Sequence, residues 1–183
     1  ISFLRTMPNM KIFAPCGKSD FSYLLNMALI DGGPVAIRYP RDCARDLSVL
    51  PVLEGYFCTE TADIVLIGIG PLMEECLIAH ERLLAVGIKC SVFYSPQVWP
   101  ITDTCASQVQ RASLIITVED NITAGGFGNA LLQRLHDEGY GGKLISLGHT
   151  HEVIAQGPRR YQLERAGLTA ENIISEVLKY AQR

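Results

Sequence analysis

The chain has 183 residues, of which 48% are hydrophobic and 19% are charged, and its formal net charge is −3. This composition supplies a folded core and argues against an intrinsically disordered chain. The acidic balance does not favour nucleic-acid binding, and the longest apolar run, residues 64–69, is far shorter than the roughly 18 residues of a membrane span. We therefore expect no nucleic-acid partner and no membrane partner.

Six cysteines are spread along the chain without a C-x-x-C pair, and neither they nor the four histidines show the spacing of zinc ligands. We therefore expect reduced thiols, as in a cytoplasmic protein, and no metal site. The cysteines are Cys16, Cys43, Cys58, Cys76, Cys90 and Cys105.

The first fifty residues predict a strand, a helix and a second strand. Residues 10–14 form a short apolar run closed by a proline, and apolar residues then recur at helical spacing over 21–29. Ser19 or Asp20 can cap that helix, and the glycines before Pro34 end it. The next apolar run, 35–37, completes the strand–helix–strand unit of a parallel sheet.

Residues 51–61 lack a clean period, and we expect a linker there between a first part, 1–50, and a second part, 62–183. In the second part apolar runs alternate with helical stripes to the end of the chain. The predicted strands are 63–69, 88–94, 114–118 and 144–147. The predicted helices begin at Gly70-Pro71, at Thr102 or Asp103, after Gly125–Gly128, and at Ala170.

Continuous apolar strands separated by amphipathic helices predict an α/β fold with a mostly parallel sheet and helices on both faces. Ligands of such sheets usually bind beyond the carboxyl ends of the strands. The residues that follow the predicted strands are therefore the first candidates for a functional site.

Two arginines, Arg38 and Arg41, follow the second predicted strand on either side of Tyr39-Pro40. A guanidinium group matches the oxygens of a phosphate or carboxylate in a bidentate manner, so the segment is a candidate anion site. A solvated pair of surface arginines is the simpler alternative. The basic balance of residues 1–50, six Lys and Arg against four Asp and Glu, suits one anionic group rather than a polymer.

Other polar residues lie at later strand ends. Glu119 could take part in acid–base chemistry, or it could act at an interface. His149 and His151 alternate around Thr150, which favours a loop or interface pair over a metal site. The glycines of 125–128 precede a helix whose N–H groups could bind an anion, but close helix packing explains them more simply.

Four segments, in order along the chain, carry a family resemblance. ISFLRTMPNMKIFAP (1–15) resembles the part of a pyrimidine-binding domain that follows the catalytic loop of thiamine-diphosphate enzymes, and PVAIRYPRD (34–42) resembles the matching segment of the 1-deoxy-D-xylulose-5-phosphate synthase family. ITVEDNITAGGFGNALLQRL (116–135) and GLTAENIISEVLKY (167–180) resemble the C-terminal domain that these synthases share with transketolases. The opening on Ile1 rather than Met agrees with a C-terminal portion of a longer protein.

The resemblance implies that residues 1–50 end a pyrimidine-binding domain and that 62–183 form a transketolase-like C-terminal domain. The family's enzyme is a cytoplasmic homodimer that condenses pyruvate with glyceraldehyde 3-phosphate, for isoprenoid, thiamine and pyridoxal synthesis. Its catalytic residues and its site for thiamine diphosphate and Mg²⁺ lie in an N-terminal half that this chain lacks. The isolated chain is therefore expected to bind neither group and to be inactive.

The resemblance also gives the arginines a role, because Arg41 or Arg38 matches the position that holds the phosphate of the acceptor. Arg41 is slightly favoured, since it lies farther from the buried strand. Two other functions stay open: the C-terminal section of a split transketolase, and a non-catalytic module that binds a partner or an anion.

Overall fold

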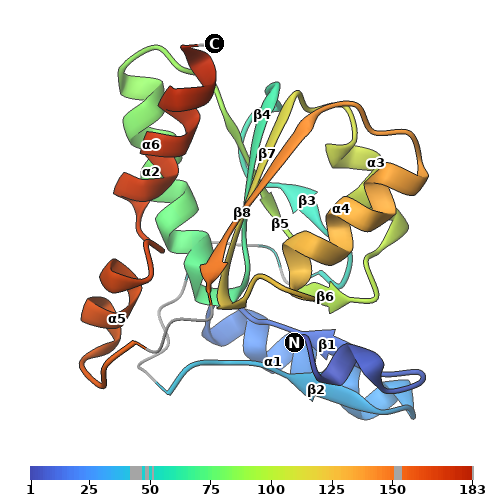
Figure 1. Ribbon diagram of the computed structural model, residues 1–183. Helices are drawn as coiled ribbons and strands as arrows, with labels where there is room; N and C mark the ends of the chain where they lie inside the picture. Colours follow the sequence, from blue (N-terminus) through green and yellow to red (C-terminus); the bar gives the residue numbers. More distant parts are fainter. Residues whose placement is uncertain (42–46, 48–49, 51, 151–153, 183) are drawn as a thin grey trace.

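The computed structural model describes residues 1–41, 47, 50, 52–150 and 154–182. Two sheets organise this part of the chain (Figure 1). The larger has five strands in the order β3-β5-β4-β7-β8, and the smaller has three in the order β2-β1-β6.

The larger sheet is parallel except for its edge strand β3, which is antiparallel to β5. Its central strands are continuous apolar runs because both of their faces are covered. The strands are β3 (Tyr56–Phe57), β4 (Ile64–Gly68), β5 (Ser91–Tyr94), β7 (Leu114–Ile122) and β8 (Lys143–His149).

Helices cover both faces of the larger sheet, with α2 and α6 on one side and α3 and α4 on the other (Figure 1). Each side has its own core, the first including Leu66 and Ile116 and the second Val65 and Ile115, as the alternation of side chains along a strand requires. The predicted α/β fold with a mostly parallel sheet is therefore confirmed. The helical segments are η2 (Gly70–Leu72), α2 (Met73–Ala85), α3 (Asp103–Val109), α4 (Phe127–Asp137), α5 (Arg159–Arg165) and α6 (Ala170–Ala181).

The smaller sheet contains the strand, helix and second strand that the sequence predicts for the start of the chain. After the short helix η1 (Leu4–Thr6) come β1 (Lys11–Phe13), α1 (Lys18–Asp31) and β2 (Val35–Ile37), and β1 and β2 are parallel. Gly32 ends α1 with φ of 72°, a left-handed conformation that glycine adopts without steric cost.

Strand β6 (Gln97–Trp99) joins the two parts of the chain. It follows β5 of the larger sheet in the sequence, but it pairs antiparallel with β1 of the smaller sheet. Ile12, which lies opposite Trp99, is fully buried in the same cluster as Val65 and Phe93 of the larger sheet. The first forty residues therefore share a core with the rest of the chain.

The structure also differs from the sequence prediction in several elements. Strand β3 lies inside the expected linker 51–61, and β6 and α5 were not predicted. β7 runs four residues beyond its predicted end at 118. Of the apolar residues at helical spacing that predict α1, Leu24 is fully buried whereas Leu29 is 76% exposed. The division of the chain into domains stays a prediction.

We expect Ile12→Ala to lower the free energy of unfolding of the 183-residue chain by about 2–5 kcal/mol, because it leaves a cavity where both parts of the chain meet. Denaturant unfolding measures this change. Ile30→Ala is the matched control, since Ile30 is 75% exposed and its loss should cost little. Equal effects of the two substitutions would contradict a shared core.

Candidate functional site

Three cationic or potentially cationic side chains from distant parts of the sequence converge on Asp120 near the carboxyl end of β7. Asp120 Oδ1 lies 2.8 Å from Nε2 of His149, at the end of β8. Asp120 Oδ2 lies 3.5 Å from Nη2 of Arg159 and 3.7 Å from Nη2 of Arg38. Arg38 also donates a hydrogen bond to the backbone carbonyl of Asp120.

The environment of Asp120 keeps it ionised. Burial alone would raise the pKa of its carboxyl, but the hydrogen bond from His149 and the charges of Arg38 and Arg159 lower that pKa below its ordinary value. Two guanidinium groups then face one carboxylate, so the cluster keeps an excess of positive charge even with a neutral His149. Such a cluster can attract a phosphate or a carboxylate.

The two predicted anion ligands have different surroundings. The side chain of Arg38 is 30% exposed and is held against Asp120, whereas Arg41 lies at the surface. The structure thus brings Arg38 and His149 together through Asp120. His151 lies outside the described residues.

Glu119 serves the helix that follows it. Its side chain is fully buried, and its carboxylate accepts the backbone N–H groups of Phe127 and Gly128, at 2.8 and 3.0 Å, at the start of α4. Burial raises the pKa of Glu119, while these hydrogen bonds oppose the rise. A Cβ atom on Gly126 would lie 2.3 Å from a Glu119 oxygen, so glycine is needed there for close approach. The N-terminus of α4 is therefore occupied by a side chain of the protein itself.

The chain's first residues are held against the same loop. Arg5 donates hydrogen bonds to the carbonyl oxygens of Gly125 and Gly126, the second at 2.8 Å, and its guanidinium lies 4.5 Å from the ring centre of Trp99. The Ser2 hydroxyl donates a hydrogen bond to the carbonyl oxygen of Ala124 at 3.0 Å. These contacts bind Ser2 and Arg5 to the loop between β7 and α4.

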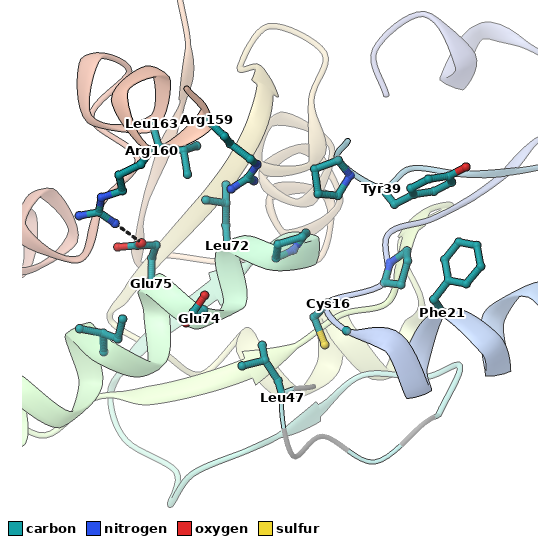
Figure 2. A pocket seen from close by; sticks show the side chains of 15 residues that line it. Cys16, Phe21, Tyr39, Leu47, Leu72, Glu74, Glu75, Arg159, Arg160 and Leu163 are labelled. Carbon is teal, nitrogen blue, oxygen red and sulfur yellow. Dashed lines mark hydrogen bonds and ion pairs between the residues drawn. The ribbon is translucent and has the colours of Figure 1, made fainter. Parts of the chain in front are cut away.

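A cavity of about 450 Å³ lies next to the Asp120 cluster, with Arg159 in its wall. Figure 2 shows Arg160 and Glu75 at one end and Tyr39 with Phe21 at the other. The two rings meet edge to face, with their centres 5.1 Å apart. Glu75 is bound by Arg160 at 2.7 Å and accepts the backbone N–H of Ala170.

The cavity therefore separates the first part of the chain from α2 and α5, and the polar groups at the Glu75 end are already paired. Its wall contains Pro15, Cys16, Gly17, Phe21, Tyr39, Pro40, Leu47, Pro71, Leu72, Glu74, Glu75, Ile78, Arg159, Arg160 and Leu163.

Arg159 is the member of the site that sequence reasoning missed. It begins α5, a seven-residue helix that contains three arginines and little apolar periodicity, so no local pattern indicated it. Its partner Asp120 is 39 positions away and could be found only from the fold. Among the described residues, no group of three His, Cys, Asp or Glu side chains could hold a metal ion, and no helix could cross a membrane.

The fold and the matched sequence place the chain in a known class. Residues 55–173 match the family described as the C-terminal domain of transketolase, and the chain belongs to this family.

The relatives named 1-deoxy-D-xylulose-5-phosphate synthase match it from end to end. The relative from Desulfotalea psychrophila is 36% identical, over 100% of this chain and 30% of its own length. Synthase 1 of Geobacter metallireducens is 34% identical, over 97% and 30%. The chain thus spans about three tenths of the length of these relatives, at their C-terminal end.

Two solved structures share the fold. A split gene transketolase, described as an inactive beta4 tetramer, is 25% identical with a TM-score of 0.88, over 97% of this chain and 60% of that one. The transketolase of Campylobacter jejuni is 20% identical with a TM-score of 0.74, over 97% of this chain and 27% of that one.

The pairing of Asp120 predicts a pH-dependent contribution to stability. Because the folded state lowers the pKa of Asp120, its contribution is present above the carboxyl's unfolded pKa, about 4, and is lost as the pH falls through the lower folded value. We expect Asp120→Asn to lower the free energy of unfolding by about 1–3 kcal/mol near neutral pH and by much less in acid.

Denaturant unfolding from pH 7 down to acid measures that difference. Asp137→Asn is the matched control, because the Asp137 side chain is 62% exposed and its loss should matter little at any pH. If Asp120→Asn lowers the free energy of unfolding by the same amount at every pH in this range, the negative charge of Asp120 does not stabilise the fold through the arginines.

Proposed function

We propose that the chain is the C-terminal section of a 1-deoxy-D-xylulose-5-phosphate synthase, which joins pyruvate to glyceraldehyde 3-phosphate. The observation that carries this proposal is the match of the whole chain to synthases at 30–36% identity. We extend to this chain the cytoplasmic location and the homodimer that the resemblance implies.

In this proposal Arg41 binds the phosphate of the acceptor. Arg38 holds in place the chain segment that leads from β2 to Arg41. Arg41 is exposed at the carboxyl end of β2, where ligands of parallel sheets bind. The guanidinium of Arg38 binds Asp120, and this contact connects the end of β2 to the end of β7. A phosphate that is bound at Arg41 is thereby held at a fixed position relative to the larger sheet.

The synthase reaction uses thiamine diphosphate and Mg²⁺, and the described residues do not fit these groups. The helix start that could receive a diphosphate, at α4, is filled by the Glu119 carboxylate. We therefore assign the cofactor site and the catalytic residues to the section that precedes this one in the relatives. This chain's own share is to bind and orient the acceptor.

One observation favours a second candidate, the C-terminal section of a split transketolase. The neighbour with a TM-score of 0.88 is a split gene transketolase, so this fold exists as a separate chain. The synthase proposal has the stronger support, because the relatives that match at 30–36% identity carry that name.

The phosphate role of Arg41 is tested in an enzyme that joins this chain to the N-terminal section of the Desulfotalea psychrophila synthase. We expect Arg41→Ala to lower kcat/KM for glyceraldehyde 3-phosphate by roughly 30- to 1000-fold, because a charged hydrogen-bonding partner is lost. The KM for pyruvate should change far less, since pyruvate has no phosphate. Arg41→Lys should recover only part of the loss.

Arg38→Ala is the comparison, and its main effect should be a lower melting temperature, because it releases the end of β2 from Asp120. Steady-state assays with phosphorylated and unphosphorylated glyceraldehyde separate the two roles. If both variants penalise the two acceptors equally, neither arginine binds the phosphate.

The isolated chain provides a separate test of where the cofactor binds. Titration with thiamine diphosphate and Mg²⁺ in a calorimeter should give no saturable heat, because the N-terminus of α4 is already capped. The chain alone should form no product. A micromolar dissociation constant would overturn the assignment of the cofactor site to the preceding section.

A further inference from the structure

The cavity beside the Asp120 cluster has the size and the lining of a small-molecule site. Its volume of about 450 Å³ lies within the roughly 300–1,000 Å³ that is typical of ligand pockets, and most of the side chains in its wall are apolar or aromatic. Leu72 and Leu163, in that wall, are 1% and 5% exposed and belong to a core of the larger sheet. The cavity can therefore hold the apolar part of a ligand away from water.

The charged groups at the Glu75 end of the cavity are used by the fold itself. The Glu75 carboxylate accepts hydrogen bonds from Nη1 of Arg160 and from the backbone N–H of Ala170, both at 2.7 Å. Arg160 also donates to Glu164 at 2.9 Å. Glu74 adds a second carboxylate on the same helix, α2. We therefore expect no anion to bind at this end.

Arg159 is the charged group of the wall that has donors available for a ligand. Within the described residues its guanidinium makes one contact, the ion pair with Oδ2 of Asp120 at 3.5 Å, which is longer than the charged hydrogen bonds of about 2.7–2.9 Å that arginines form with carboxylates. Asp120 also binds Arg38 and His149, so Arg159 has only a share of that carboxylate. A guanidinium has five N–H donors, and most of those of Arg159 remain for another anion.

The far end of the cavity is aromatic. Tyr39 is 62% exposed and meets Phe21 edge to face, and Figure 2 shows Arg159 between this aromatic pair and the paired charges of Glu75 and Arg160. An exposed aromatic ring favours contact with a flat or branched apolar group. One cation beside an apolar space that ends in an aromatic ring indicates an amphipathic anion as the ligand.

We propose that this cavity is a second anion site, which binds a small amphipathic phosphate or carboxylate. The anionic group of the ligand meets Arg159, and its apolar body lies along Leu72 towards Tyr39. Arg41 does not belong to the wall of the cavity, so the site is separate from the one proposed for the phosphate of the acceptor. A fork of N–H donors beside an apolar wall selects the charge and the body of the ligand together.

Titration of the 183-residue chain with 1-naphthyl phosphate, followed by the fluorescence of the naphthyl ring, tests the site without any enzyme activity. We expect saturable binding with a dissociation constant below about 1 mM. 1-Naphthol, which lacks the charge, and inorganic phosphate, which lacks the apolar body, should each bind at least tenfold more weakly. 1-Naphthoic acid shows whether a carboxylate replaces the phosphate, and the cation 1-naphthylmethylamine should bind more weakly than either anion.

Substitutions on two sides of the cavity separate the anionic contact from the apolar one. Arg159→Ala should weaken 1-naphthyl phosphate at least tenfold and leave 1-naphthol nearly unchanged, and Arg159→Gln replaces it should the alanine variant fail to fold. Ile78→Phe, which adds volume to the wall, should weaken both ligands. Arg165→Ala is the matched control, because Arg165 is an exposed arginine of the same helix and lies outside the cavity wall.

Three results would overturn the proposal. The first is a folded Arg159→Ala or Arg159→Gln variant that binds 1-naphthyl phosphate as tightly as the unchanged chain. The second is displacement of 1-naphthyl phosphate by an equal concentration of sn-glycerol 3-phosphate, because a site that needs no apolar body is a site for a short sugar phosphate. The third is loss of binding in the fusion with the N-terminal section of the Desulfotalea psychrophila synthase, because that section then fills the cavity.

The proposed function and this site fail in different ways. A fusion that binds 1-naphthyl phosphate through Arg159 but makes no 1-deoxy-D-xylulose 5-phosphate would leave the second anion site standing and would count against the proposed function alone. A fusion that makes the product but does not bind 1-naphthyl phosphate would overturn the second anion site alone.

Discussion

Strand β1 lies between β2 and β6, and the arrangement of the site depends on this pairing. Its parallel partner β2 ends one residue before Arg38, and its antiparallel partner β6 comes from the second part of the chain. The burial of Ile12 against residues of the larger sheet fixes where β2 ends relative to β7. Arg38 can reach Asp120 only because that placement is fixed by apolar packing.

Two neighbouring carboxyl groups show how position decides chemistry at the end of β7. Glu119 points inward, is fully buried and caps α4, and burial raises its pKa. Asp120 points to the other face, meets His149 and two arginines, and has a lowered pKa. The alternation of side chains along a strand gives the first residue a structural task and leaves the second to organise the charged cluster.

The sequence was informative where apolar runs were long. Residues 64–69 and 114–118 predicted buried strands correctly, and Thr102 caps α3 by accepting the N–H of Cys105. Strand β6 was missed because its three residues lie between prolines, which usually exclude a strand interior. The site was only partly predictable: the position of Arg38 after a strand made it a candidate, but its contacts with Asp120 join residues 82 positions apart and could be found only from the fold.

Product formation by fused enzymes is the most direct test of the proposal that this chain is the acceptor-binding section of a synthase. Three fusions share the N-terminal section of the Desulfotalea psychrophila synthase and carry its own C-terminal section, this chain, or the C-terminal section of the Campylobacter jejuni transketolase. With pyruvate and glyceraldehyde 3-phosphate, mass spectrometry should detect 1-deoxy-D-xylulose 5-phosphate from the first two and not from the third. If the fusion of this chain folds and binds the cofactor but, like the transketolase fusion, makes no 1-deoxy-D-xylulose 5-phosphate, the proposed function is wrong.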